Sequence, residues 1–188
     1  MNSVKEVLAQ LFNEAIALTD KGYFEVNHDE EWPSACILNE QVNALDKISR
    51  WRPTPQTSPV NFDGLANALG DNIHPDVIEY FSSFWSGSLQ AKTKEGPLSL
   101  IQLWNNEDFD RLIENLIGHL FAKQRAKLPF TIFFATTDPD SELFLSIENS
   151  TGKILLEEPG RPPIKEIDTD LVCFLKRVTP VNTLPEIY

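Results

Sequence analysis

The amino-acid sequence predicts a single α+β domain in which a mainly antiparallel sheet packs against several helices. The chain has 188 residues, 41 % of them hydrophobic and 12 of them Phe, which is enough to bury one core without disulfides. Strand patterns cluster between helical patterns instead of alternating with them as in a doubly wound fold. No internal repeat or Gly/Ser-rich linker divides the chain. We therefore expect one domain over residues 1–188, with residues 179–188 as a loose tail.

The chain is expected to begin with a helix and a proline-rich loop. Ser3 and Glu6 form a capping-box pattern, and apolar residues follow at helical spacing as far as about Thr19. Residues 24–60 contain four prolines and are predicted to be loop. Short strands are expected within that segment at residues 36–38 and 48–51.

Two shorter helices are predicted next. The first covers residues 62–69 and ends at Gly70, the residue type that most easily closes a helix. His74 and Pro75 then suit the cap and first turn of a second helix. We expect that helix to run to about Trp85.

A hairpin and the longest helix follow. Residues 88–94 and 98–104 flank Glu95-Gly96-Pro97 and predict two paired strands. Asn105 is expected to cap a long amphipathic helix, which Pro129 prevents from continuing.

The carboxyl-terminal part is predicted to be a meander of strands closed by a helix. Three strand patterns are separated by turn residues, and such close spacing favours antiparallel pairing. They cover residues 131–136, 143–148 and 153–158. A last helix is expected over residues 168–178.

Acidity is the property that says most about function. The net charge is −12, and residues 1–80 hold 5 Lys and Arg against 13 Asp and Glu. A field of this sign attracts cationic partners and repels nucleic acid, whose phosphates need a basic surface. We therefore expect a positively charged protein partner and no nucleic acid.

Metal, cofactor and secretion signals are weak. The three histidines and two cysteines are scattered, so we expect no metal site and no cofactor, and His119 is interpreted as structural. Cys36 and Cys173 fit a reducing compartment as small buried side chains.

The amino terminus lacks a signal-peptide pattern, and no apolar run is long enough to cross a bilayer. We expect a cytoplasmic protein that reaches a membrane only through its partner.

Carboxylates on the long helix form an acidic ridge. Glu107, Asp110 and Glu114 fall on the side opposite the apolar stripe, where a solvated face is the simplest interpretation. A pair of catalytic carboxylates for glycoside cleavage would also need a cleft and a raised pKa. We therefore expect no enzyme and keep paired-carboxylate catalysis as the weakest alternative.

Several motifs closely resemble the Syd family of bacterial SecY-interacting proteins. The central match runs from Trp104-Asn105-Asn106-Glu107-Asp108-Phe109 through residues 114–120 to Lys127-Leu128-Pro129. Weaker matches occur at Pro33-Ser34-Ala35-Cys36-Ile37, Trp51-Arg52-Pro53 and Ile73-His74-Pro75. The chain departs from the family pattern at Ala35, in place of a proline, and at Asp110, in place of a basic residue.

The resemblance implies a SUKH-like fold with a concave acidic groove. It also implies binding to the positively charged cytoplasmic loops of the SecY subunit of the Sec translocon, in quality control or negative regulation at the inner membrane. Independently, cytoplasmic loops of membrane proteins carry excess Lys and Arg, to which an acidic soluble protein is attracted. The alternative is an immunity-type protein that neutralises a basic toxin.

The resemblance and the charge pattern together predict ten partner-binding acids. Glu107, Asp108 and Glu114 lie inside the central match, although Asp108 equally suits the helix cap. The others are added because of their charge and expected exposure: Asp110, Asp29, Glu30, Glu31, Asp71, Asp76 and Glu79.

Overall fold

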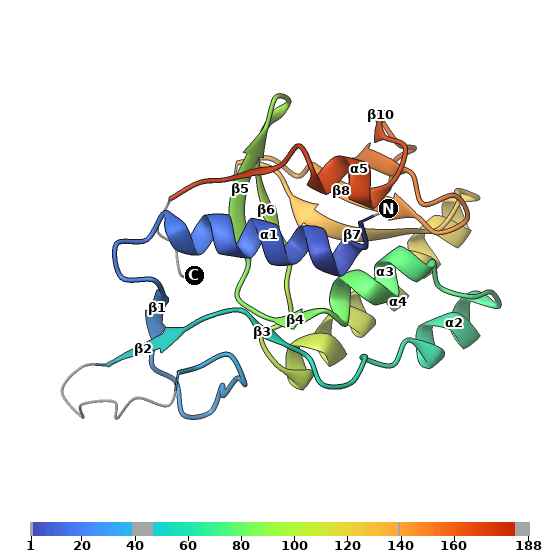
Figure 1. The fold of residues 1–188 in the computed structure, drawn as a ribbon. Coiled ribbons are helices and arrows are strands. Elements are labelled where there is room, and N and C mark those ends of the chain that lie inside the picture. Colours follow the sequence, from blue (N-terminus) through green and yellow to red (C-terminus); the bar gives the residue numbers. More distant parts are fainter. Residues whose placement is uncertain (1, 39–46, 139, 183–188) are drawn as a thin grey trace.

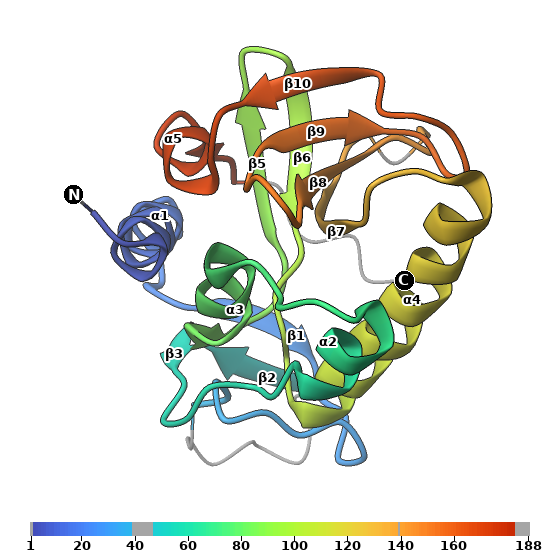
Figure 2. The ribbon, with the colours of Figure 1, turned by 90° about the vertical axis from the view of Figure 1, so that its right-hand side faces the viewer.

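A curled, seven-stranded antiparallel sheet forms the centre of the computed structural model (Figures 1 and 2). The structure describes residues 2–38, 47–138 and 140–182. The strand order is β10-β9-β8-β7-β6-β5-β11, and each neighbouring pair is antiparallel. The strands are β5 (Leu89–Thr93), β6 (Gly96–Leu100), β7 (Thr131–Thr136), β8 (Phe144–Glu148), β9 (Ile154–Glu157), β10 (Lys165–Asp168) and β11 (Thr179–Pro180).

Five helices in the described part of the chain pack around this sheet. They are α1 (Val4–Ala17), α2 (Asp63–Leu69), α3 (Pro75–Phe81), α4 (Asn106–Ala126) and α5 (Leu171–Leu175). Figure 2 shows α1 and α5 on one side of the β5–β6 hairpin and α4 on the other, with α2 beside α4. One core joins helices and sheet, and Leu8, Leu116 and Phe134 are fully buried in it. The fold is therefore a single α+β domain, as the sequence predicts.

Two small antiparallel pairs complete the fold. They are β1 (Phe24–Asn27) with β2 (Ile48–Trp51), and β3 (Thr54–Pro55) with β4 (Phe84–Trp85). Cys36, Trp51 and Trp104 form a second, smaller buried cluster beneath the first pair. This cluster connects the loop region to the start of α4.

The helix ends follow the local sequence signals. Ser3 and Glu6 form both hydrogen bonds of a capping box at α1, and Gly70 closes α2 in the left-handed conformation with φ of 76°. The His74 side chain accepts a hydrogen bond from the N–H of Asp76 and caps α3. Each of these signals lies within one helical turn of the residues that it organises, so the sequence alone reveals it.

Other predictions are wrong because distant pairing overrides the local pattern. The helix expected to reach Trp85 ends at Phe81, since Phe84 and Trp85 pair with β3. Residues 36–38 form a turn with one isolated bridge from Ile37 to Trp51 in place of a strand.

The carboxyl-terminal end also differs from prediction. The last helix is only α5, because Asp168 belongs to β10 and Asp170 is the helix cap. β11 pairs with β5 inside the segment expected to be a tail, while residues 183–188 of that tail lie outside the described residues. Cys173 is exposed, and only Cys36 is buried.

Candidate functional site

The amino-terminal end of α4 is fixed by two reciprocal hydrogen bonds. The Asp108 N–H donates to Oδ1 of Asn105 over 2.9 Å, and the Trp104 N–H donates to Oδ2 of Asp108 over 3.0 Å. The first bond satisfies a backbone donor that a helix start leaves unpaired, and the second fixes the residue that precedes the cap. Asp108 is thus half-buried and serves the cap, the second of the two roles considered for it.

Three acids project into solvent from the first turns of α4. Glu107, Asp110 and Glu114 are exposed, whereas Phe109 and Leu112 on the opposite side are buried. The acidic ridge predicted from helical spacing therefore exists as an exposed surface. Whether a partner binds there stays a prediction.

A loop after β1 is bound to the same end of α4. The indole Nε1 of Trp104 donates to the Trp32 carbonyl over 3.0 Å, and the Asn105 side chain donates to the Pro33 carbonyl over 2.8 Å. The guanidinium carbon of Arg111 lies 4.2 Å from the centroid of the Trp32 ring, within cation–π range. The acidic residues just before Trp32 are thereby held beside α4.

Six of the predicted acids consequently lie on neighbouring elements. All six are exposed, and we call them the acidic face: Asp29, Glu30, Glu31, Glu107, Asp110 and Glu114. Arg111 adds one positive charge among them. The loop contact spans 72 residues of sequence, so no local signal could have predicted it.

Three predicted acids lie elsewhere. Asp71 follows α2 and is exposed, whereas Asp76 and Glu79 of α3 are only half-buried, against expectation. Burial raises the pKa of Asp76, and the charges of Glu79 and Asp170 add to the effect, while His74 opposes it. Glu79 accepts a hydrogen bond from the backbone N–H of Lys5 over 3.1 Å. Asp76 and Glu79 thus lie where α3 meets the starts of α1 and α5.

Neither of two cavities of about 230 Å³ is lined by any of the ten predicted acids. The first, which we call the α1 cavity, lies between the end of α1, β1 and the start of β5. Trp51 lines it and also contacts Trp104, with 5.6 Å between ring centroids. The α1 cavity includes Asp20 and Glu25, which sequence reasoning missed because an isolated acid carries no pattern. The concave acidic groove stays a prediction.

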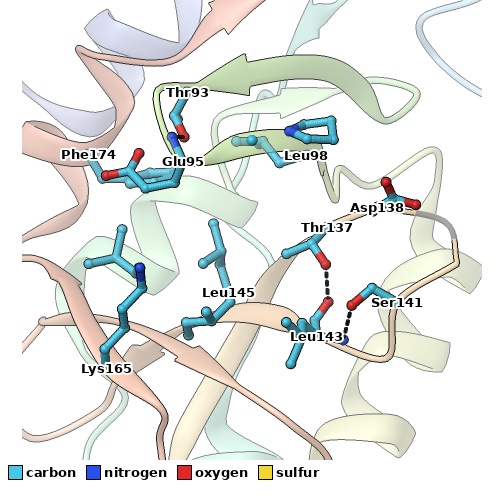
Figure 3. A pocket seen from close by; sticks show the side chains of 14 residues that line it. Thr93, Glu95, Leu98, Thr137, Asp138, Ser141, Leu143, Leu145, Lys165 and Phe174 are labelled. Atoms are coloured by element: carbon cyan, nitrogen blue, oxygen red, sulfur yellow. Dashed lines mark hydrogen bonds between the residues drawn. The ribbon is translucent and has the colours of Figure 1, made fainter.

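The second cavity lies within the curl of the main sheet, and we call it the sheet cavity (Figure 3). Five aliphatic side chains line it, Leu98, Leu145 and Leu156 among them, together with polar and charged side chains that include Lys165. The alternation along β6, β8 and β9 predicts apolar side chains on one face of the sheet. It does not predict that the curl leaves a space between them.

An ion pair beneath the sheet accounts for the remaining buried charges. The Lys123 ammonium of α4 donates to Glu157 of β9, whose other carboxylate oxygen accepts from the Ser146 hydroxyl. His119 lies one turn from Lys123 and shares a 2.9 Å hydrogen bond with the Thr131 hydroxyl. Burial lowers the pKa of His119, and the charge of Lys123 lowers it further, while Glu157 opposes them. This network joins α4 to the sheet and is structural.

Two further properties concern the described residues only. They contain no group of three or more His, Cys, Asp and Glu side chains that could hold a metal ion. Among the helices within the described ranges, none is long and apolar enough to cross a membrane.

Comparison with known proteins agrees with the sequence resemblance. A family model described as Syd protein (SUKH-2) matches residues 4–180. Protein Syd of Pseudoalteromonas atlantica is 37 % identical over 158 residues, which cover 84 % of this chain and 84 % of that protein. Protein Syd of Colwellia psychrerythraea is 35 % identical over 169 residues, covering 86 % and 83 %, and that of Pectobacterium atrosepticum is 35 % identical over 149 residues, covering 79 % of each. With a match that spans the helices and the curled sheet alike, the chain belongs to the Syd family.

Proposed function

We propose that this protein binds the positively charged cytoplasmic loops of the SecY subunit of the Sec translocon. The acidic face supports this function, because it gathers exposed carboxylates from two segments that are distant in sequence. Binding of this kind makes and breaks no covalent bond, so the protein acts as a non-enzymatic regulator or quality-control factor. It is held at the cytoplasmic side of the inner membrane only through SecY.

Electrostatics sets the character of this interaction. An exposed ion pair contributes only about 0–1 kcal/mol, so several pairs must form together for useful affinity. Their long-range field raises the association rate and selects cationic partners. Affinity should consequently fall as salt shortens the Debye length from about 10 Å at 0.1 M to about 3 Å at 1 M.

The decisive measurement is binding to purified SecY complex in lipid nanodiscs across a salt series. The double variant Glu107→Lys, Glu114→Lys reverses two charges of the acidic face. We expect its affinity to fall by at least about tenfold at low salt, since two attractive pairs become repulsive. The difference between variant and parent should shrink as salt is added.

A matched control separates local from overall charge. The double variant Glu14→Lys, Glu166→Lys makes the same change in net charge at exposed positions on α1 and β10, away from the acidic face (Figure 2). It should bind SecY nearly as well as the parent chain. Equal losses in both double variants, or binding indifferent to salt, would contradict the proposal.

A further inference from the structure

The sheet cavity has an apolar floor formed by side chains of β6, β8 and α5. Leu98, Leu145 and Phe174 line it and are almost fully buried, while Leu156 and Ile167 line it as half-exposed side chains. Figure 3 shows Leu98 and Leu145 beside one space between the β5–β6 hairpin and β10. The cavity therefore presents apolar surface to solvent without being filled by the chain's own described residues.

One wall of the cavity is fixed by Arg177, which follows α5. Its guanidinium donates to Glu95 in the β5–β6 turn over 2.6 Å and to Asp168 of β10 over 2.7 Å. A third bond of 3.1 Å reaches the Ile167 carbonyl, and the guanidinium carbon lies 5.2 Å from the Phe174 ring centroid. Burial alone would raise the pKa of Glu95, but the hydrogen bond from Arg177 leaves it lowered. The hairpin tip and β10 are thus clamped at a fixed separation.

The opposite wall is an acidic loop between β7 and β8. The Thr137 hydroxyl donates to the Leu143 carbonyl over 2.8 Å, and the Leu143 N–H donates to the Ser141 hydroxyl over 3.1 Å (Figure 3). Asp138 lines the cavity and is exposed. Asp140 and Glu142 in the same loop are also exposed. None of these three acids forms an ion pair with any residue within the described ranges.

The size of the cavity decides which class of ligand fits. A cavity of about 150 Å³ holds benzene, whereas sites for cofactors and drug-sized molecules occupy about 300–1,000 Å³. At about 230 Å³, the sheet cavity suits one large side chain. Its apolar floor requires that side chain to be apolar. At the rim, the exposed acids Asp138, Asp140 and Glu142 of the loop outnumber Lys165, a cation that also lines the cavity, so the net charge there favours basic neighbours.

We propose that the sheet cavity receives one Leu or Phe side chain of a polypeptide partner, with adjacent Lys or Arg residues on the acidic loop. The identity of that partner rests on the proposed function, in which it is a cationic SecY loop. Burying one apolar side chain gives the affinity that exposed ion pairs lack. The acidic face and the sheet cavity would then play different parts, one in attraction and one in anchoring.

The first test uses two synthetic peptides and the full chain. One peptide is acetyl-Lys-Lys-Phe-Lys-Lys-amide, and the other carries Ala in place of Phe. We expect the Phe peptide to bind at least about tenfold more tightly, because only its side chain is buried. Amide NMR shifts should map its binding to Leu145, Ile167 and their neighbours. Equal affinities, or shifts confined to other surfaces, would overturn the proposal.

Variants that fill the cavity supply the control. Leu143→Trp should remove the preference for the Phe peptide, whereas Ile164→Trp, at an exposed position outside the cavity lining, should preserve it. Leu156→Trp serves the same purpose if thermal melting shows that Leu143→Trp fails to fold. A folded variant with a filled cavity that still binds the Phe peptide more tightly than the Ala peptide would overturn the proposal.

Binding to the SecY complex separates this inference from the proposed function. Suppose that Glu107→Lys, Glu114→Lys weakens SecY binding but a folded cavity-filling variant does not. The proposed function is then supported, and the proposal that the sheet cavity binds a partner side chain is wrong. If the parent chain does not bind SecY but still binds the Phe peptide more tightly at the cavity, the proposed function is wrong and the proposal for the sheet cavity is supported. Light scattering completes the test, because a dimer that Leu143→Trp dissociates would show that a second copy fills the cavity and would overturn the proposal.

Discussion

Gly152 is a single residue on which two distant segments depend. It lies in the β8–β9 turn with φ of 76°, and a Cβ atom there would lie 2.7 Å from Nε2 of His74. His74 is the cap of α3, and its N–H donates to Oδ1 of Asn149 over 2.9 Å. The turn between two strands and the start of a helix therefore occupy each other's space, so a side chain at Gly152 would disturb both.

A matched pair of substitutions measures this contact. Gly70 also has φ of 76°, but a Cβ atom there would meet nothing within 4 Å. Gly70→Ala should cost about 1–2 kcal/mol of unfolding free energy through backbone strain alone. Gly152→Ala should cost clearly more in urea unfolding, because it adds the collision with His74. Equal losses would show that His74 moves aside freely.

The two cysteines should differ sharply in reactivity. Burial raises the pKa of Cys36 to about 11, although hydrogen bonding with Ser34 opposes the rise. Hydrogen bonding with Asp170 also raises the pKa of Cys173, but Cys173 is exposed to the reagent whereas Cys36 is buried. Because the thiolate is the reacting form, a disulfide reagent at pH 8 should modify Cys173 in the native protein and Cys36 only after unfolding. Rapid native modification in Cys173→Ser would contradict this expectation.

At the scale of elements, local signals predict α4 well and the short strands poorly. Asn105, the apolar stripe and Pro129 all lie within or next to α4, so its start and end follow from adjacent residues. β4 and β11 are two-residue strands whose existence depends on partners far away in sequence. Their residues carry no pattern of their own, which is why a helix and a tail were predicted there.

The candidate site also combines features that local sequence predicts with features that depend on distant contacts. The exposure of Glu107 and Glu114 follows from helical periodicity. Their proximity to Glu30 depends on Trp104 contacting the loop at Trp32, and a contact across the fold has no signature in either segment. The sheet cavity was missed because it arises from the curvature of several strands together.

The contact of α4 with β9 supplies a test of buried charge. Lys123 is 5 % exposed and Glu157 is fully buried, so Lys123→Met leaves an uncompensated carboxylate and should cost about 3–5 kcal/mol. The double variant Lys123→Met, Glu157→Leu should regain most of that loss in chemical unfolding. Lys153→Met, which breaks the exposed pair with Glu166, should change stability little. A double variant as unstable as Lys123→Met would contradict this account.

At the scale of the whole molecule, stability should depend on pH through His119. Its pKa is lowered from 6.5 in the folded protein, mainly by burial. Below pH 6.5 the unfolded chain therefore binds more protons than the folded one, and stability falls as the pH drops toward the folded pKa. Within the described part of the chain, the charges that affect this shift are those of Lys123, which lowers the pKa, and Glu157, which raises it.

Unfolding by urea at a series of pH values checks this sign. His119→Gln keeps a group that can hydrogen-bond to Thr131 but cannot titrate. Its unfolding free energy should decline less steeply than that of the parent chain between pH 7 and pH 5. Parallel curves for the two proteins would assign the decline to other groups.

The position of α1 has a consequence for synthesis on the ribosome. The apolar stripe of this helix is buried against α3, α5 and β11, and the last two are among the final elements to be translated. Until they emerge from the exit tunnel, the part of the stripe that packs against them has no native surface to cover it, although α3 can already cover the rest. The nascent chain should therefore need a chaperone to shield its first helix for most of its elongation.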